Sequence, residues 1–429
     1  MSSAAPRRPR AVVVVTGSEL VRGERTDLNG PFLAQEALRL GLEPAQIAIV
    51  GDAPEELEAT LHEALSADAV LVSGGLGPTH DDRTVELVAK ALDVGLHIDG
   101  ELEREIESVS RSAAERLKRD YADFAPGVTK QATIPDGAIS LGLAGTAPGL
   151  LVPRGGARVV VLLPGPPAEL RRLWPRALET AAFRELLAGA RPPGRRVFRL
   201  FGVSESAVAR ALAEAGGDGG GVEATICARD FEIHIDLMIE AGAEERADAL
   251  EAAFLPPLER WLYGRDERGI EEHVLELCRE RGLRLATAES CTGGLVAARL
   301  TSVPGSSRVV VGGVVAYADE VKQAELGVPA ELLARHGAVS AEVAAAMARG
   351  ARERLGAEIA VAVTGIAGPD GGTAEKPVGL VYLHAEGPDG GMGREFSFPG
   401  DRATIRARSV VAALHLVRRL LSRSADELV

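Results

Sequence analysis

Lysine, cysteine and aromatic residues are scarce in this chain of 429 residues, in which aromatics make up 3% of the sequence. The three cysteines cannot all pair, and none has the C-x-x-C spacing typical of zinc sites, so a reducing cytoplasm is expected. No apolar run approaches the length of a membrane span. The net charge of −14 argues against a surface that coats nucleic acid. We therefore expect a cytoplasmic protein with no membrane partner.

The scarcity of lysine makes the few that are present informative. Five lysines stand beside 43 arginines. Lysine can lose its proton when desolvated and then act as a base, whereas arginine effectively cannot, so lysine is expected where arginine will not serve. Lys130, Lys322 and Lys376 lie in glycine-rich or motif-like stretches. Each of the three is therefore a candidate functional residue.

Ser290 lies where a strand is expected to turn into a helix. The apolar run 283–288 predicts a buried strand, and 295–300 predicts a helix. The N–H groups of residues 291–294 would lack helical acceptors, and with the helix dipole they could stabilise an oxyanion. The alternative is that Ser290 or Thr292 only caps the helix, since both residue types are preferred caps.

Lys322 follows a second apolar run, 309–316, which also predicts a strand. A serine activated by a lysine is a known form of the nucleophile-and-base pair. Lys322 could instead be a solvated helix residue beside Asp319 and Glu325. Cys291 is the rival nucleophile, because a thiolate is intrinsically more reactive than a hydroxyl.

Several motifs in this half resemble one known domain. The stretch 288–294 (AESCTGG), the segment from Tyr317 to Lys322, the stretch 363–373 (VTGIAGPDGGT) and 376–379 (KPVG) occur in order. From about Gly269 onward they resemble the nicotinamide mononucleotide deamidase domain of CinA-family proteins. The resemblance implies hydrolysis of nicotinamide mononucleotide to nicotinate mononucleotide and ammonia, without a cofactor.

The resemblance also implies roles for individual residues. Ser290 would be the nucleophile and Lys322 its base, and Tyr317 and Thr364 would be site residues. From the residues themselves, Thr364 could help to hold the oxyanion, and Tyr317 could stack on or orient a pyridine ring or only fill core. Arg402, which we prefer, or Arg406 could clamp the 5′-phosphate, with Lys376 of the glycine-rich loop available to it; the alternatives are solvated arginines and an ordinary surface loop. The substrate-binding set is Glu289, Cys291, Thr292, Gly293, Gly294, Gly365, Lys376, Arg402 and Arg406.

The first part of the chain alternates expected strands (11–15, 47–50, 69–73) with helical patterns (31–40, 54–66). This order predicts a parallel sheet covered on both faces, with ligands at the carboxyl ends of its strands. The loop 74–82 (GGLGPTHDD) has the glycines of a phosphate cradle, and Asp81 and Asp82 could hold a divalent cation against a diphosphate. Alternatively, Asp82 caps the next helix and the glycines only form a turn.

With KQA at 130–132, GTAPG at 145–149 and PGPPAEL at 164–170, this region is similar to the N-terminal domain of the same family. That domain is in turn similar to molybdopterin-binding proteins, and the resemblance implies metal-dependent hydrolysis of ADP-ribose. Binding of a pterin or nucleotide without turnover is the alternative. The implied nucleotide-binding residues are Glu19, Asn29, Gly74, Gly75, Gly77, Thr79 and Lys130, with Asp81 and Asp82 as metal ligands (Mg²⁺ or similar).

Between these regions, a strand (197–201), a helix (204–215), a hairpin (223–229 and 232–240) and a broken helix (243–261) resemble a KH-type module. Its loop 216–219 has no flanking lysine and carries an acid, which makes nucleic acid an improbable partner. The expected fold is α/β in three domains: a three-layer α/β/α domain (1–170), the KH-type module (171–264) and an α/β deamidase domain (265–429). We expect a homodimer acting on small nucleotides; a scaffold for competence or DNA-damage proteins is the remaining alternative.

Overall fold

The computed structural model describes residues 8–422 and confirms a mixed α/β fold. The chain divides into two compact units, 1–193 and 194–429. Within residues 8–422, no helix combines the length and the apolar character needed to cross a bilayer.

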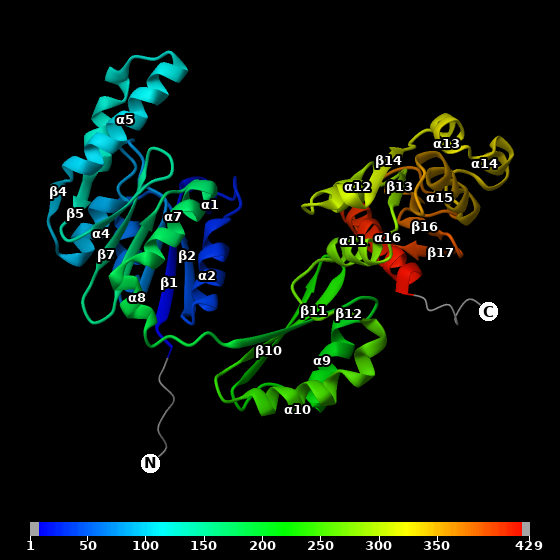
Figure 1. Ribbon diagram of the computed structural model, residues 1–429, viewed down its shortest axis with the longest axis horizontal. Coiled ribbons are helices and arrows are strands. Elements are labelled where there is room, and N and C mark those ends of the chain that lie inside the picture. Colours follow the sequence, from blue (N-terminus) through cyan, green and yellow to red (C-terminus); the bar gives the residue numbers. More distant parts are fainter. Residues whose placement is uncertain (1–7, 423–429) are drawn as a thin grey trace. The chain divides into compact units, whose positions relative to one another are not determined.

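The first unit is built on a six-stranded sheet in the order β2-β1-β3-β8-β7-β6. Helices such as α2, α4 and α7 lie beside the strands of this unit (Figure 1). Strands β2, β1, β3 and β8 pair in parallel, as the alternating pattern predicts. Strands β7 and β6 extend the sheet in antiparallel orientation beside β8. A short pair, β4 with β5, lies outside this sheet. The strands are β1 (Arg10–Thr16), β2 (Glu43–Val50), β3 (Ala69–Ser73), β4 (Leu96–Ile98), β5 (Thr133–Pro135), β6 (Ile139–Leu143), β7 (Pro148–Pro153) and β8 (Val159–Leu163).

Strand β1 is apolar throughout because both of its faces are buried. Val12 and Val14 belong to one core, and Ala11, Val13 and Val15 belong to the other. The first core packs helices α3 to α6 and the second packs α2, α7 and α8. The helices are α1 (Ser18–Val21), α2 (Asn29–Arg39), α3 (Pro54–Ala64), α4 (Thr84–Leu92), α5 (Gly100–Leu117), α6 (Ala125–Ala132), α7 (Pro167–Glu179) and α8 (Ala181–Leu187).

The first unit extends beyond the boundary expected at residue 170. Trp174 of α7 and Phe183 of α8 are buried in its second core, with their rings edge to face at 5.6 Å. These two helices cover one face of the sheet and extend the first unit past residue 170. The segment expected to form a KH-type module lies in the second compact unit together with the C-terminal region.

The second unit begins with an antiparallel sheet in the order β10-β11-β9-β12. Ser204 caps α9 by accepting from the N–H of Ala207, as its sequence pattern predicts. The expected long helix 243–261 breaks at Pro256 into α10 and a 3₁₀ turn. The elements are β9 (Gly194–Leu200), α9 (Glu205–Glu214), β10 (Val222–Arg229), β11 (Glu232–Ile239), α10 (Glu244–Phe254), the 3₁₀ turn Pro256–Trp261 and β12 (Leu262–Gly264).

The remainder of the unit is a five-stranded sheet in the order β14-β13-β15-β16-β17. Strands β14, β13 and β15 are parallel, and helices pack on both faces of the sheet. The strands are β13 (Leu285–Glu289), β14 (Val310–Val315), β15 (Ile359–Gly365), β16 (Leu380–Gly387) and β17 (Gly390–Ser397). The helices are α11 (Ile270–Glu280), α12 (Leu295–Thr301), α13 (Asp319–Leu326), α14 (Ala330–His336), α15 (Ala341–Leu355) and α16 (Arg402–Ser422).

Candidate functional site

Three parallel strands of the C-terminal sheet end side by side around Ser290. The N–H of Ser290 donates to the carbonyl of Val363 on β15 at 2.9 Å, and the N–H of Ala316, just past β14, donates to the carbonyl of Glu289 at 2.8 Å. Ser290 is 9% exposed. The serine therefore lies at the carboxyl edge of the sheet, between the ends of β14 and β15, as the sequence predicts.

Lys322 on α13 reaches the same edge. Its Nζ donates to the carbonyl of Tyr317 at 3.0 Å and lies 3.4 Å from Oδ1 of Asp319. Tyr317 directly follows Ala316, the residue that pairs with β13. Lys322 is only 1% exposed, so the alternative of a solvated surface lysine is wrong.

Glu289 caps α12, a role expected of Ser290 or Thr292 only as the alternative to catalysis. One carboxylate oxygen accepts from the N–H groups of Gly294 and Val296 at 2.9 and 3.0 Å, and the other accepts from Ala297 at 2.9 Å. Both oxygens of the buried Glu289 are occupied by these N–H groups, which contradicts its expected contact with substrate. Its charge also offsets the partial positive charge of the helix N-terminus.

The set of oxyanion donors is smaller than expected. The N–H of Gly293 donates to Ser290, and the N–H of Gly294 donates to Glu289. In the described part of the chain, the N–H groups of Cys291 and Thr292 donate to no other residue, although both residues are buried, at 5% and 0% exposed. The hydroxyl of Thr364 was expected to assist, but it donates to the carbonyl of Ala338 at 2.8 Å.

The expected phosphate ligands are held in different ways. Arg406 donates through Nε to the carbonyl of Cys291 at 3.0 Å and through Nη2 to that of Thr292 at 2.9 Å. Lys376 donates to the carbonyls of His336 and Val339 at 2.6 and 2.7 Å. Both cations therefore brace the protein itself, which corrects their expected role as free phosphate ligands.

Arg402 is the exposed cation of this edge. It donates to the carbonyl of Gly368 and to the hydroxyl of Tyr317, both at 2.9 Å, and keeps further N–H donors. The Tyr317 side chain is 61% exposed. An open aromatic ring beside a guanidinium suits a ligand that has both a flat ring and an anionic group.

Cys291 is a weak rival to Ser290. Burial raises the pKa of its thiol to about 11, so the group is almost entirely protonated near neutral pH. Its carbonyl, rather than its sulfur, is the atom that Arg406 holds.

A buried polar cluster links strand β11 to α16, and the sequence interpretation missed it. Oε1 of Glu232 lies 2.5 Å from Nε2 of His415, and its other oxygen accepts from the Tyr263 hydroxyl at 2.7 Å. The His415 ring stacks on Phe201 with ring centroids 3.8 Å apart. The only available signal was a histidine within the apolar pattern of a helix, which does not reveal a partner 183 residues away.

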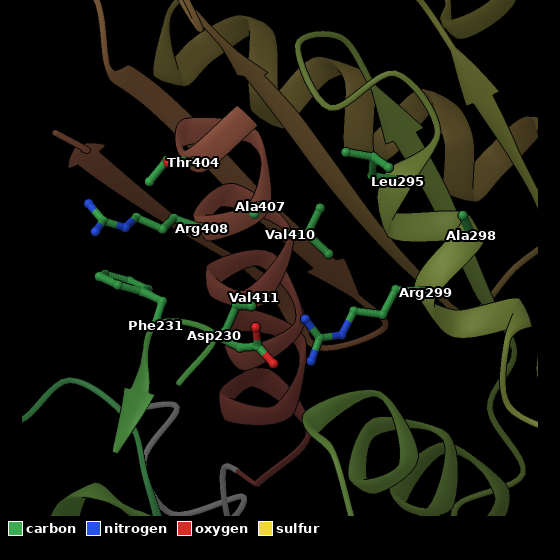
Figure 2. A pocket seen from close by; sticks show the side chains of 10 residues that line it. All are labelled: Asp230, Phe231, Leu295, Ala298, Arg299, Thr404, Ala407, Arg408, Val410 and Val411. Carbon is green, nitrogen blue, oxygen red and sulfur yellow. The ribbon is translucent and has the colours of Figure 1, made fainter. Parts of the chain in front are cut away.

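A cavity of about 450 Å³ lies within the second unit, between the β10–β11 turn and helices α12 and α16 (Figure 2). It is mostly apolar, and Arg299 and Arg408 lie along it. None of its lining residues belongs to the expected site. The lining residues are Asp230, Phe231, Leu295, Ala298, Arg299, Thr404, Ala407, Arg408, Val410 and Val411.

In the first unit most of the expected nucleotide-binding residues line one of two cavities, and Gly74 and Thr79 line neither of these. One of about 570 Å³ is lined by Glu19 and Asn29, and one of about 260 Å³ by Gly75, Gly77, Asp82 and Lys130. Asn29 is buried and donates to Ser73 Oγ and to the carbonyl of Gly165 at 2.9 and 2.7 Å.

The loop 74–82 is fixed by hydrogen bonds of its own. The Asp82 carboxylate accepts from the N–H and the hydroxyl of Thr79, and Lys130 donates to the Thr79 carbonyl. The first residue before α4 is Arg83, so the alternative in which Asp82 caps that helix is wrong. Within residues 8–422, no three His, Cys, Asp or Glu side chains are grouped to hold a metal ion, so a cation here would need ligand oxygens as well as Asp81 and Asp82.

Comparison with known proteins covers nearly the whole chain. Residues 267–421 match the CinA C-terminal domain, and residues 12–182 match a probable molybdopterin binding domain. A CinA-like protein of Mycolicibacterium paratuberculosis is 43% identical over 97% of this chain and 99% of its own length. One from Mycobacterium sp. (strain MCS) is 44% identical over 96% of this chain and 99% of its own.

A solved structure of the competence/damage inducible protein CihA from Agrobacterium tumefaciens is 45% identical and covers 35% of this chain and 93% of its own, with a TM-score of 0.35. The two whole-length relatives identify this chain as a member of the CinA family.

Proposed function

We propose that the C-terminal region hydrolyses the carboxamide of nicotinamide mononucleotide to give nicotinate mononucleotide and ammonia. The observation that carries the proposal is that a nearly buried serine directly follows β13, while a buried lysine of α13 donates to the carbonyl of Tyr317, just past the adjoining strand β14. An exposed tyrosine and an exposed arginine beside them offer contacts for the pyridine ring and the 5′-phosphate.

In the first half of the reaction, the amine of Lys322 accepts the hydroxyl proton of Ser290. The Ser290 oxygen then attacks the carboxamide carbon, and the N–H groups of Cys291 and Thr292 stabilise the negative oxygen. Lys322 returns the proton to the nitrogen, and the C–N bond breaks to release ammonia. Water, deprotonated by Lys322, then hydrolyses the serine ester and regenerates Ser290.

The experiment is to incubate the purified protein with nicotinamide mononucleotide and to measure both products. We expect ammonia and nicotinate mononucleotide in equal amounts, at a rate that a metal chelator does not change, because every group in the proposed mechanism is a side chain or a backbone N–H. Absence of ammonia release at any nucleotide concentration would end the proposal.

We further propose that the first unit hydrolyses the pyrophosphate of ADP-ribose with a bound divalent cation. Asp81 and Asp82 would hold the cation, which supplies charge neutralisation at the phosphates when bound. This proposal is supported by their position in the glycine-rich loop at the carboxyl end of β3 and by a half-buried lysine beside it. Turnover with Mg²⁺ and none with a chelator is expected; binding of ADP-ribose without turnover would instead indicate a binding module.

A further inference from the structure

Two charged side chains hold the turn after Ser290 from opposite sides. Arg406 donates to the carbonyl oxygens of Cys291 and Thr292. On the other side, the carboxylate of Glu289 accepts from the N–H groups of Gly294, Val296 and Ala297. Neither side chain has another hydrogen-bond partner among residues 8–422. The turn is therefore fixed by one cation and one anion rather than by the helix alone.

Holding a carbonyl also fixes the N–H group of the same peptide unit. A trans peptide is planar, and its C=O and N–H point in opposite directions. When Arg406 holds the Cys291 carbonyl, the Thr292 N–H must point away from Arg406. The Cys291 N–H is fixed in the same way, because the Ser290 carbonyl accepts from Gly293 at 3.1 Å.

The position of Gly293 supports this close approach of the guanidinium. Its φ is +60°, a conformation that favours glycine, and a Cβ there would lie 3.3 Å from Nη2 of Arg406. Glycine thus allows both the turn and the contact with Arg406. Meanwhile Glu289 occupies three of the donors that would otherwise compete for an anion.

We propose that Arg406 is a positioning residue that aims the Thr292 N–H at the developing oxyanion, with Glu289 restricting the donors to Cys291 and Thr292. This inference rests on the proposed deamidation and names the device that makes its oxyanion site. On this inference Arg406 acts by orienting an N–H group that stabilises the transition state. Arg402, four residues earlier on the same face of α16, is then the cation for the phosphate.

The experiment compares three variants of the full chain by ammonia release from nicotinamide mononucleotide. Arg406→Met should lower kcat by roughly 10²-fold with KM changed by less than about threefold, because a lost oxyanion donor acts on the transition state. Arg406→Lys should recover part of kcat, and added guanidinium ion should raise the rate of Arg406→Met several-fold. Arg408→Met is the matched control, because Arg408 also donates to a backbone carbonyl from α16, that of Pro399 at 2.7 Å, and its kcat should stay within about twofold.

The opposite kinetic result would overturn the inference. If Arg406→Met raises KM about tenfold or more while kcat is retained, Arg406 binds the phosphate. If neither constant changes, Arg406 has no part in the reaction.

A fluorophosphonate separates failure of this inference from failure of the proposed function. The Ser290 oxygen would form a bond to phosphorus as its proton passes to Lys322 and fluoride leaves. The phosphonyl oxygen would then accept hydrogen bonds from the N–H groups of Cys291 and Thr292. Slower labelling of Ser290 in Arg406→Met than in Arg408→Met supports the positioning role even if wild type releases no ammonia. Equal labelling rates in the two variants would overturn it.

Discussion

Ser290 in the C-terminal sheet and the glycine-rich loop 74–82 in the first sheet both follow the carboxyl end of a parallel strand, but their side chains differ in exposure. Ser290, Lys322 and Thr364 are 9%, 1% and 0% exposed, whereas Thr79 and Asp81 are exposed. Buried polar groups must find partners within the protein, and here backbone carbonyls hold Lys322 and Thr364. The residues at the edge of the C-terminal sheet are thus held by contacts within the protein, whereas Thr79 and Asp81 of the glycine-rich loop face solvent.

The largest effect that sharpens this comparison concerns the two buried or half-buried lysines of the C-terminal region. Lys322→Met should lower kcat for ammonia release by roughly 10³-fold, as expected for loss of a general base. Lys376 also donates to backbone carbonyls, so Lys376→Met tests whether bracing alone explains the loss; its kcat should fall by less than about tenfold. Equal losses in the two variants would mean that Lys322 is only structural.

The second prediction separates the two sites by their need for metal. A chelator should abolish ADP-ribose hydrolysis and leave ammonia release unchanged. Asp81→Asn should lower ADP-ribose turnover at least about tenfold, because one of two carboxylate ligands loses its charge. The same variant is its own control, since its rate of ammonia release should match wild type. Loss of both activities on chelation would break the comparison.

The third prediction concerns the pH dependence of stability at the buried cluster of the second unit. Burial lowers the pKa of His415 to about 4, from 6.5, despite the neighbouring Glu232. As the pH falls, His415 therefore binds a proton in the unfolded chain before it does so in the folded protein. Its contribution to the free energy of unfolding is fully present above about pH 6.5 and is lost as the pH falls toward 4. The loss through His415 should reach ~3 kcal/mol.

Glu232 adds a further loss at lower pH. Burial alone would raise the pKa of its carboxyl, but hydrogen bonds from His234, His415 and Tyr263 outweigh burial and lower the pKa from 4.5 to about 2. Its stabilising contribution is therefore lost as the pH falls below about 4.5. Denaturant unfolding of wild type and His415→Gln from pH 4 to 7 measures the loss through His415, and extending the wild-type series to about pH 2 measures the loss through Glu232. The variant should lack the slope between 4 and 6.5, and parallel profiles would contradict the assignment.

The smallest expected effect is a change in the free energy of unfolding, which tests how tightly the glycine-rich loop 74–82 is packed. Gly75 has φ +67°, and a Cβ there would lie 2.1 Å from Thr84 Oγ1. Gly137 has φ +78°, with nothing within 4 Å of its Cβ position. Both Gly→Ala variants incur about 1 kcal/mol of backbone strain, and Gly75→Ala should lose roughly 1–3 kcal/mol more through the clash. Equal unfolding free energies in the two variants would show that the loop adjusts freely.

The fold could be predicted from the sequence wherever a local pattern determines the structure. The run Ala11–Val15 is apolar because β1 is covered on both faces, and the break at Pro256 follows from proline chemistry. Ser290 was placed correctly because a strand end and a helix start are both local signals.

The side-chain contacts of the site could not be predicted, because they depend on residues distant in the chain. Nothing near Arg406 in sequence indicates that its partners are carbonyls 114 and 115 residues earlier. Glu289 was misassigned because a carboxylate next to a nucleophile suggests substrate contact, and only the path of α12 shows that it caps that helix.

The most direct test of the account compares the rates of ammonia release by Ser290→Ala and Cys291→Ala. With Ser290 as nucleophile and Cys291 protonated, Ser290→Ala should lose at least about 10³-fold while Cys291→Ala keeps a rate within about tenfold of wild type. A Ser290→Ala protein that still releases ammonia at a rate near wild type would contradict the serine–lysine mechanism.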